Sequence, residues 1–260
     1  MFGALVTTVT DAARHLDATA GPDDHDRCSL PPPGLSYERA VEELDVAGRK
    51  VLWSVDLGFA QVDPEVAGLA ETAALALIDA AGLTPAERGV QLSDPVRVWL
   101  SAGSMDTWMN LEPGMWPERA DELDRPARVA LEATEGRTAP QMARTMVRRA
   151  GLEDEVAELF SDVEVLLTPT TAIPAFPAEG KVPREINGVE VKPAMAMAVP
   201  FTMLANLCWN PAVSVPAGVT SDGLPVGLQI MVRRHADEVA LRLARVFEQA
   251  RPWPRTAPGW

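Results

Sequence analysis

The segment from Pro193 to Ser221 contains no charged residue, although charged residues make up 23% of the chain. It reads PAMAMAVPFTMLANLCWNPAVSVPAGVTS and is followed directly by DGLPVGLQIMV. Such a run is typical of a membrane-spanning helix, of a buried sheet core, or of the wall of a ligand pocket. Because these three interpretations predict different proteins, this run constrains the fold more than any other feature.

Prolines and asparagines inside the run argue against the membrane interpretation. A spanning helix needs about 20 mainly apolar residues whose backbone groups are all paired within the segment. Here Pro200, Pro211 and Pro216 interrupt the run, Asn206 and Asn210 lie within it, and no dense Lys/Arg cluster flanks it. We therefore expect no membrane association and place the run inside a folded domain.

Composition narrows the class of protein further. The chain has 260 residues, of which 47% are hydrophobic, and this is enough for a sizeable core. Its formal net charge of −14 repels phosphate backbones, so we expect no nucleic-acid partner. Cys28 and Cys208 lie far apart in sequence and are expected to be reduced thiols. The first residues lack the features of a signal peptide, which favours a cytoplasmic location.

Strand-like and helix-like patterns alternate along the chain and predict an α/β fold. The expected strands are Arg49–Val55, Val163–Thr168, Ala212–Pro216 and Val226–Val232, the last two joined by a hairpin-like turn. The expected helices begin after Thr10, at Asp63-Pro64-Glu65, at Thr138 with a break at Gly151, and at Asp237. Residues 91–123 have no clear period and are expected to be irregular.

Residues that bind metals or cofactors are not grouped at useful spacings. The three histidines, His15, His25 and His235, lie apart from one another and from both cysteines. The loop around His25 is rich in aspartate but lacks the ligand spacing of an EF-hand, so it is interpreted as a solvated turn. Phosphate-binding and dinucleotide-binding glycine motifs are missing too. We expect neither a metal nor a cofactor.

A nucleophile with its base is missing as well. Ser104 lies near Asp106, but no histidine is placed to activate it, and no GxSxG motif occurs. Cys208 lies in the apolar run without a basic neighbour in sequence, so it is interpreted as a small buried hydrophobe. The sequence thus predicts a pocket-like wall without a catalytic centre of its own.

Three ordered segments resemble the C-terminal portion of the amidase signature family. They read DVEVLLTPTTAIPAFP, VPFTMLANLCWNPAVSVPAG and SDGLPVGLQIMVRR, and VFEQARPW follows them. The earlier stretches GALVTTVTDAARHLDATAGPDDHD and DLGFAQVDPEV resemble the helix-and-loop and strand-to-helix segments of that family. The resemblance covers essentially residues 1–260 and is weak only in residues 91–123. It implies a mixed β-sheet flanked by helices, as one C-terminal part of an amidase domain with an incomplete amidase signature fold.

The resemblance also implies a mechanism whose residues this chain lacks. In the family, a lysine is the general base and acts through a serine in a cis peptide bond. That serine relays the proton from a second, nucleophilic serine, which forms an acyl-enzyme with the amide carbonyl. A glycine-rich loop donates N–H groups to the oxyanion. These groups lie in a Gly/Ser-rich region that precedes the part resembling Met1 to Asp11. No GGSSGGS-like stretch occurs here, so no residue is assigned as catalytic.

By the same resemblance, Phe201, Thr202 and Asn206 pass close to the acyl-binding side of the site. They are the candidate substrate-binding residues for a small amide or acyl group, and Met203 and Trp209 are expected to shape the same pocket. The alternative is that these residues only pack against the sheet. Asn206 is the most informative, because a buried amide without partners costs about 1–3 kcal/mol.

Three functional hypotheses follow from the missing catalytic groups. The chain is an amidase fragment that is inactive alone, a non-catalytic subunit that completes a separate catalytic N-terminal half, or a pseudoenzyme that retains a ligand pocket. In each case, losing half of the sheet is expected to expose strand edges and apolar faces. We therefore expect self-association or poor solubility when the chain is made alone.

Overall fold

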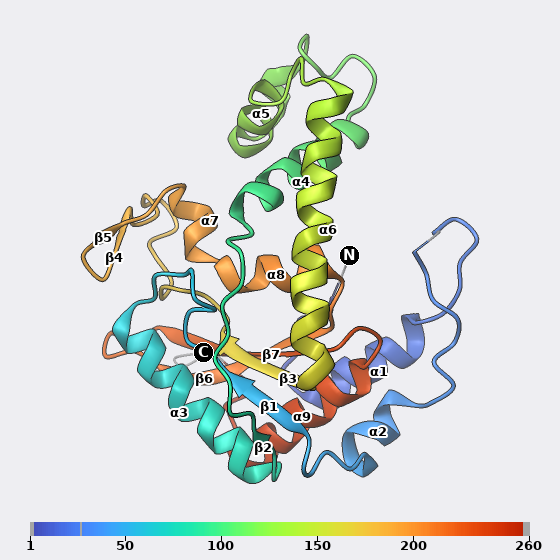
Figure 1. Cartoon of the computed structure of the whole chain (residues 1–260), viewed down its shortest axis with the longest axis vertical. Helices are drawn as coiled ribbons and strands as arrows, with labels where there is room; N and C mark the ends of the chain where they lie inside the picture. The colour runs from blue at the N-terminus through green and yellow to red at the C-terminus, as the bar shows by residue number, and fades with distance from the viewer. Residues whose placement is uncertain (1–2, 27, 257–260) are drawn as a thin grey trace.

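A computed structural model describes residues 3–26 and 28–256; Met1, at the predicted boundary of the family's catalytic region, lies outside these residues. The chain folds around a five-stranded mixed sheet of order β2-β1-β3-β7-β6 (Figure 1). Strand β1 pairs in parallel with β2 and β3, whereas β7 pairs antiparallel with β3 and β6. The strands are β1 Lys50–Trp53, β2 Thr84–Pro85, β3 Val165–Pro169, β6 Ala212–Val219 and β7 Pro225–Val232. The predicted α/β class and mixed sheet are confirmed.

One face of the sheet is covered by four helices (Figure 1). They are α1 Val9–Thr19, α2 Tyr37–Glu43, α3 Pro64–Ala80 and α9 Asp237–Ala250. Helix α3 begins as predicted, because the Asp63 carboxylate accepts hydrogen bonds from the N–H groups of Glu65 and Val66. Helix α1 begins earlier than predicted, since Thr8 rather than Thr10 caps it.

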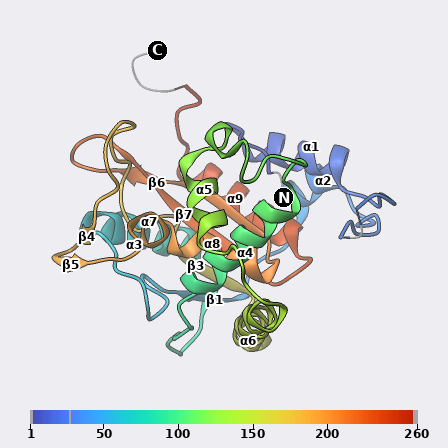
Figure 2. The same cartoon turned by 90° about the horizontal axis from the view of Figure 1, so that it is seen from above.

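The other face carries α6 Ala139–Asp162, α7 Ala194–Ala198 and α8 Pro200–Cys208. Helix α6 rises steeply from the sheet, and Figure 2 shows it nearly end-on. Its upper part joins α4 Val96–Met109, η1 Ala120–Glu122 and α5 Arg125–Glu132 in a protruding arm (Figure 1). A small ribbon, β4 Glu185–Ile186 and β5 Val189–Glu190, lies in the loop before α7.

Two predictions for the middle of the chain are wrong. Residues 91–123 are not irregular throughout, because α4 and η1 form there. Helix α4 has no capping side chain and packs against α5 and α6, so tertiary contacts rather than local signals define it. Helix α6 also passes unbroken through Gly151. A glycine costs a helix about 1 kcal/mol, and burial of Leu152, Val156 and Leu159 outweighs this cost.

The charge-free run divides into a covered part and an uncovered part. Its first half forms α7 and α8, whose residues are largely buried in a cluster that also contains Leu166 and Met231 of the sheet. Its second half forms β6, where Ala212, Ser214 and Pro216 are exposed. Within residues 3–26 and 28–256, no helix is long and apolar enough to cross a membrane.

Candidate functional site

A row of polar side chains lies on the sheet face beneath α8. Gln229 of β7 is buried, and its Nε2 donates to Thr168 Oγ1 at 3.2 Å and to the Phe201 carbonyl at 3.3 Å. The Thr168 hydroxyl in turn donates to the Pro169 carbonyl at 2.8 Å. These bonds connect β7, β3 and the first turn of α8, so they hold the start of that helix at a fixed height above the sheet.

The row continues toward β6, where it becomes accessible. Thr170 Oγ1 and Ser214 Oγ are 2.7 Å apart across the sheet, and Gly227 of β7 lies between them. A Cβ built on Gly227 would lie 2.6 Å from Thr170 Oγ1 and 2.7 Å from Ser214 Oγ. Glycine is therefore required for this close approach of three strands. We call Thr170, Ser214 and Gly227 the polar shelf.

The three predicted substrate-binding residues lie on α8 in different environments. Phe201 is fully buried in the cluster between α8 and the sheet. Thr202 is half-buried and donates to the Val199 carbonyl at 3.1 Å. Asn206 is exposed and donates to the Thr202 carbonyl at 2.8 Å. Thr202 and Asn206 are one turn apart and share one face of α8, whereas Phe201 packs inward.

The expected burial of Asn206 is wrong, and the buried amide is Asn210. Asn210 Nδ2 donates to the Val232 carbonyl at 2.8 Å, while its Oδ1 is buried without a partner among the described residues. The i,i+4 spacing turns Asn206 to the surface of a helix that the sequence suggested only as an apolar run. Met203, the other apolar candidate, is buried.

Trp209 and Arg149 form a separate contact at the far end of α8. Trp209 caps this helix in the left-handed conformation, and the Arg149 guanidinium lies 5.6 Å from its ring centroid. Arg149 also donates to the Leu207 carbonyl at 3.1 and 2.7 Å. Sequence reasoning missed Arg149, Thr170, Ser214 and Gln229, because no local motif marks contacts between distant elements.

None of the isolated reactive residues is organised for catalysis in the part of the chain described. Ser104 is buried and donates to the Leu100 carbonyl of its own helix at 2.8 Å. Burial raises the pKa of the Cys208 thiol to about 12, although Arg149 and Arg234 act in the opposite direction. Cys208 is thus the buried hydrophobe predicted, but basic side chains do lie near it. Residues 3–26 and 28–256 contain no group of His, Cys, Asp or Glu suited to a metal ion.

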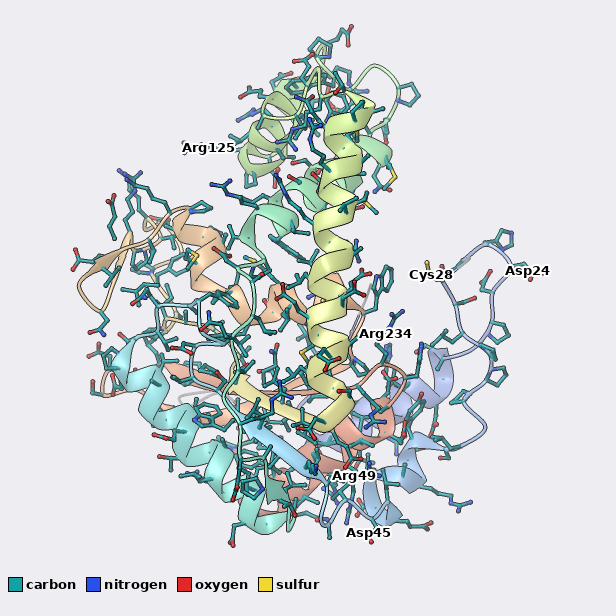
Figure 3. The ribbon with its side chains drawn as sticks, viewed as in Figure 1. Asp24, Cys28, Asp45, Arg49, Arg125 and Arg234 are labelled. Carbon is teal, nitrogen blue, oxygen red and sulfur yellow. The ribbon has the colours of Figure 1, made fainter. Side chains whose placement is uncertain are left out.

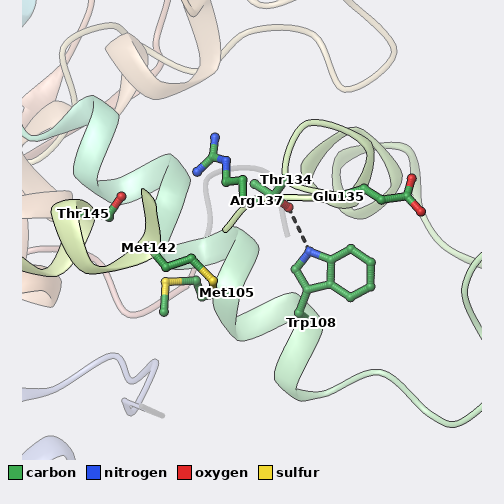
Figure 4. Close-up of a pocket in the computed structure, with 8 residues that line it drawn as sticks. Met105, Trp108, Thr134, Glu135, Arg137, Met142 and Thr145 are labelled. Atoms are coloured by element: carbon green, nitrogen blue, oxygen red, sulfur yellow. Dashed lines mark hydrogen bonds between the residues drawn. The ribbon is translucent and has the colours of Figure 1, made fainter. Parts of the chain in front are cut away.

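Two hollows lie on the arm, away from the polar shelf. The first, of about 200 Å³, is lined by Met105, Trp108 and Met142 (Figure 4). Its Trp108 Nε1 donates to Thr134 Oγ1 at 2.9 Å, and that hydroxyl donates to the Ala130 carbonyl. The lining therefore holds no free hydroxyl nucleophile. The second, of about 390 Å³, lies between α4 and α6 and is rich in arginine.

Comparison with known proteins identifies the class to which this fold and polar shelf belong. The family model described as Amidase matches residues 1–241. An acylamidase from Rhodococcus erythropolis is 33% identical over 98% of this chain and 53% of its own length. The glutamyl-tRNA(Gln) amidotransferase of Thermosynechococcus vestitus contains a chain that is 28% identical over 99% of this one and 56% of its own length.

A solved structure gives the same result. The crystal structure of a bacterial aryl acylamidase of the amidase signature family superposes with a TM-score of 0.80 and 26% identity, over 95% of this chain and 52% of that one. The chain belongs to the amidase signature family. It spans about half the length of the curated relatives that it matches.

Proposed function

We propose that this chain is the C-terminal part of an amidase and forms one wall of a carboxamide-hydrolysing site. The observation that supports this most directly is the polar shelf, which opens beside an uncovered strand and has no base or nucleophile near it. In the complete enzyme, the C–N bond of a carboxamide is cleaved through an acyl-enzyme. The nucleophile, its base and the oxyanion donors then come from a segment outside these 260 residues.

The 260-residue chain alone is expected to be inactive. In a comparable serine hydrolase, losing the coupled nucleophile and base lowers kcat by about 10⁶. Losing an oxyanion donor costs a further factor of about 10² to 10³. Together these losses leave no practical hydrolysis.

The outer edge of β6 is the surface where a complementary segment fits. The Val232 N–H donates to the Pro211 carbonyl, so this opposite pair is hydrogen-bonded. Hydrogen-bonded and non-bonded pairs alternate in an antiparallel ladder. The backbone groups of Ala212, Ser214 and Pro216 therefore point away from β7. Proline, which has no N–H to donate, is typical of an edge position.

The edge also lacks the usual protection against strand pairing. No residue of β6 is charged, and the strand is eight residues long. Natural edge strands are often kept apart by lysine or by inward charges. An added strand from the catalytic half would cover this edge and close the open side of the polar shelf. Thr202 and Asn206 then form the acyl-side wall, with Phe201 holding their helix in place.

A complementation assay tests the proposal. The chain is mixed or co-expressed with the part of the Rhodococcus acylamidase that it does not match, and hydrolysis of an aryl acylamide such as p-nitroacetanilide is followed. We expect no hydrolysis by either part alone and measurable hydrolysis by the pair. Activity of the chain alone that is equal in wild type and Ser104→Ala would contradict the proposal.

Two substitutions at one position test the edge itself. Ser214→Ala removes the hydroxyl that contacts Thr170, whereas Ser214→Pro removes in addition the outward N–H and places a ring on the edge. Both leave the bonds between β6 and β7 in place. We expect Ser214→Pro to weaken association of the two parts by at least about tenfold relative to Ser214→Ala. Equal association of the two variants would exclude pairing along β6.

Without a complementary segment, β6 is free to pair with another copy of the chain. We infer self-association of the isolated chain, measured by analytical ultracentrifugation over a range of concentrations. A monomer at all concentrations would contradict this inference. We also infer a cytoplasmic location, because Cys28 is an exposed free thiol and Cys208 a buried one. Fractionation of cells that express the protein tests this location.

A further inference from the structure

Four arginines meet in the groove between α4 and α6 on the arm. Arg97 belongs to α4, Arg137 precedes the first residues of α6, and Arg144 and Arg148 follow along α6. The groove has a volume of about 390 Å³, within the range of sites for small molecules. It lies away from the polar shelf of the sheet, so the proposed hydrolytic site does not explain it.

The spacing of these residues directs them to one side. Arg137, Arg144 and Arg148 are seven and four residues apart, which places them along one face near the N-terminal end of α6. Arg97 and Ser101 are separated by one turn of α4. The Arg137 guanidinium donates to Ser101 Oγ at 3.2 Å and so connects the two walls.

Carboxylates do not neutralise this cluster in the part of the chain described. Seven other arginines form ion pairs with aspartate or glutamate, but none is recorded for these four. Arg149, the immediate neighbour of Arg148, pairs with Glu153 at 3.0 Å. This difference is notable because acidic residues outnumber basic ones by 37 to 23.

The cluster therefore has a cost that folding alone does not explain. Like charges one helical turn apart, as in Arg144 and Arg148, destabilise a helix, and the positive end of the α6 dipole adds to the repulsion. Clustered guanidinium groups bind carboxylate and phosphate oxygens through paired N–H donors. An anion in the groove would remove the repulsion from all four arginines.

We propose that the groove between α4 and α6 is a binding site for a small, multiply charged anion with phosphate or carboxylate oxygens. Arg97, Arg137, Arg144 and Arg148 supply the charge, while Ser101 fixes the orientation of Arg137. The site is independent of the proposed hydrolytic function. It can therefore hold or fail without affecting that proposal.

Calorimetric titration of the 260-residue chain with inorganic pyrophosphate and, separately, citrate tests the site. The test variant is Arg144→Gln/Arg148→Gln. The control variant is Arg233→Gln/Arg234→Gln, which changes the net charge equally on exposed residues below the arm (Figure 3). We expect saturable binding of at least one anion, weakened at least about tenfold in the test variant and within about twofold in the control. Circular dichroism confirms that each variant is folded.

Each result decides the proposal. Binding of pyrophosphate alone identifies phosphate oxygens as the ligand groups, and binding of citrate alone identifies carboxylates. Loss of binding in both variants, or in neither, would overturn the site, because the affinity would then follow net charge or other residues. Absence of binding to both anions would also overturn it. A polyglutamate peptide that binds the groove when neither anion does would replace the small ligand with an acidic protein segment.

Discussion

Replacement of Arg149 by methionine tests how α8 is held above the sheet. The Arg149 guanidinium donates twice to the Leu207 carbonyl, at 3.1 and 2.7 Å, and pairs with Glu153 at 3.0 Å. Its side chain is 19% exposed, so these contacts are largely shielded from water. Methionine keeps most of the apolar stem but leaves the carbonyl without these donors.

The magnitude follows from these contacts. A hydrogen bond to a charged group contributes about 1.5–3 kcal/mol to stability, and an i,i+4 ion pair adds about 0.3–0.5 kcal/mol. Because the two bonds share one acceptor and are not additive, we expect Arg149→Met to lower the free energy of unfolding by ~2–4 kcal/mol. For a chain of this size this corresponds to a fall in Tm of roughly 5–15 °C.

Thermal unfolding followed by circular dichroism measures the change, with Arg148→Met as the matched control. Arg148 is the next residue on the same helix, is exposed and has no recorded ion pair. Its replacement is expected to change stability by less than about 0.5 kcal/mol. Equal losses of Tm in the two variants would refute the assigned role of Arg149.

Three further predictions concern the polar shelf, α8 and the buried thiol. Gly227→Ala is expected to cost about 1–3 kcal/mol, partly recovered by adding Ser214→Gly, and urea unfolding of both variants checks this. Phe201→Ala is expected to cost about 3–5 kcal/mol and Asn206→Ala less than about 0.5 kcal/mol; similar costs would contradict their assigned burial. Since the folded pKa of Cys208, about 12, exceeds the reference value of 9.0, its contribution to stability is complete below pH 9 and is lost as pH rises toward 12. Iodoacetamide at pH 8 is accordingly expected to modify the exposed cysteine and to modify Cys208 only after denaturation.

Elements with strong local signals were predictable from sequence. The Asp63-Pro64-Glu65 start of α3, the β6–β7 hairpin and the start of α9 at Asp237 are confirmed. Each combines a cap or turn residue with a clear hydrophobic period. Helix α4 lacked both signals, since its order depends on packing against α5 and α6. Family membership was also predictable, because it rests on long ordered segments of sequence.

The contacts that build the candidate site were not predictable. Thr170, Ser214 and Gly227 meet only when β3, β6 and β7 are placed in register. A single sequence does not contain that register, and the same limit hid the bond between Gln229 and the start of α8. The exposure of Asn206 was missed because an uncharged run does not reveal which side of a helix faces outward.

The most direct test of the central claim is the hydrolysis of p-nitroacetanilide by the 260-residue chain, with and without a complementary amidase half. The account predicts no turnover by the chain alone, turnover after the two parts associate, and weaker association when Ser214→Pro blocks the edge of β6. Turnover by the isolated chain that survives Ser104→Ala would show that these residues contain their own catalytic centre, and would contradict the account.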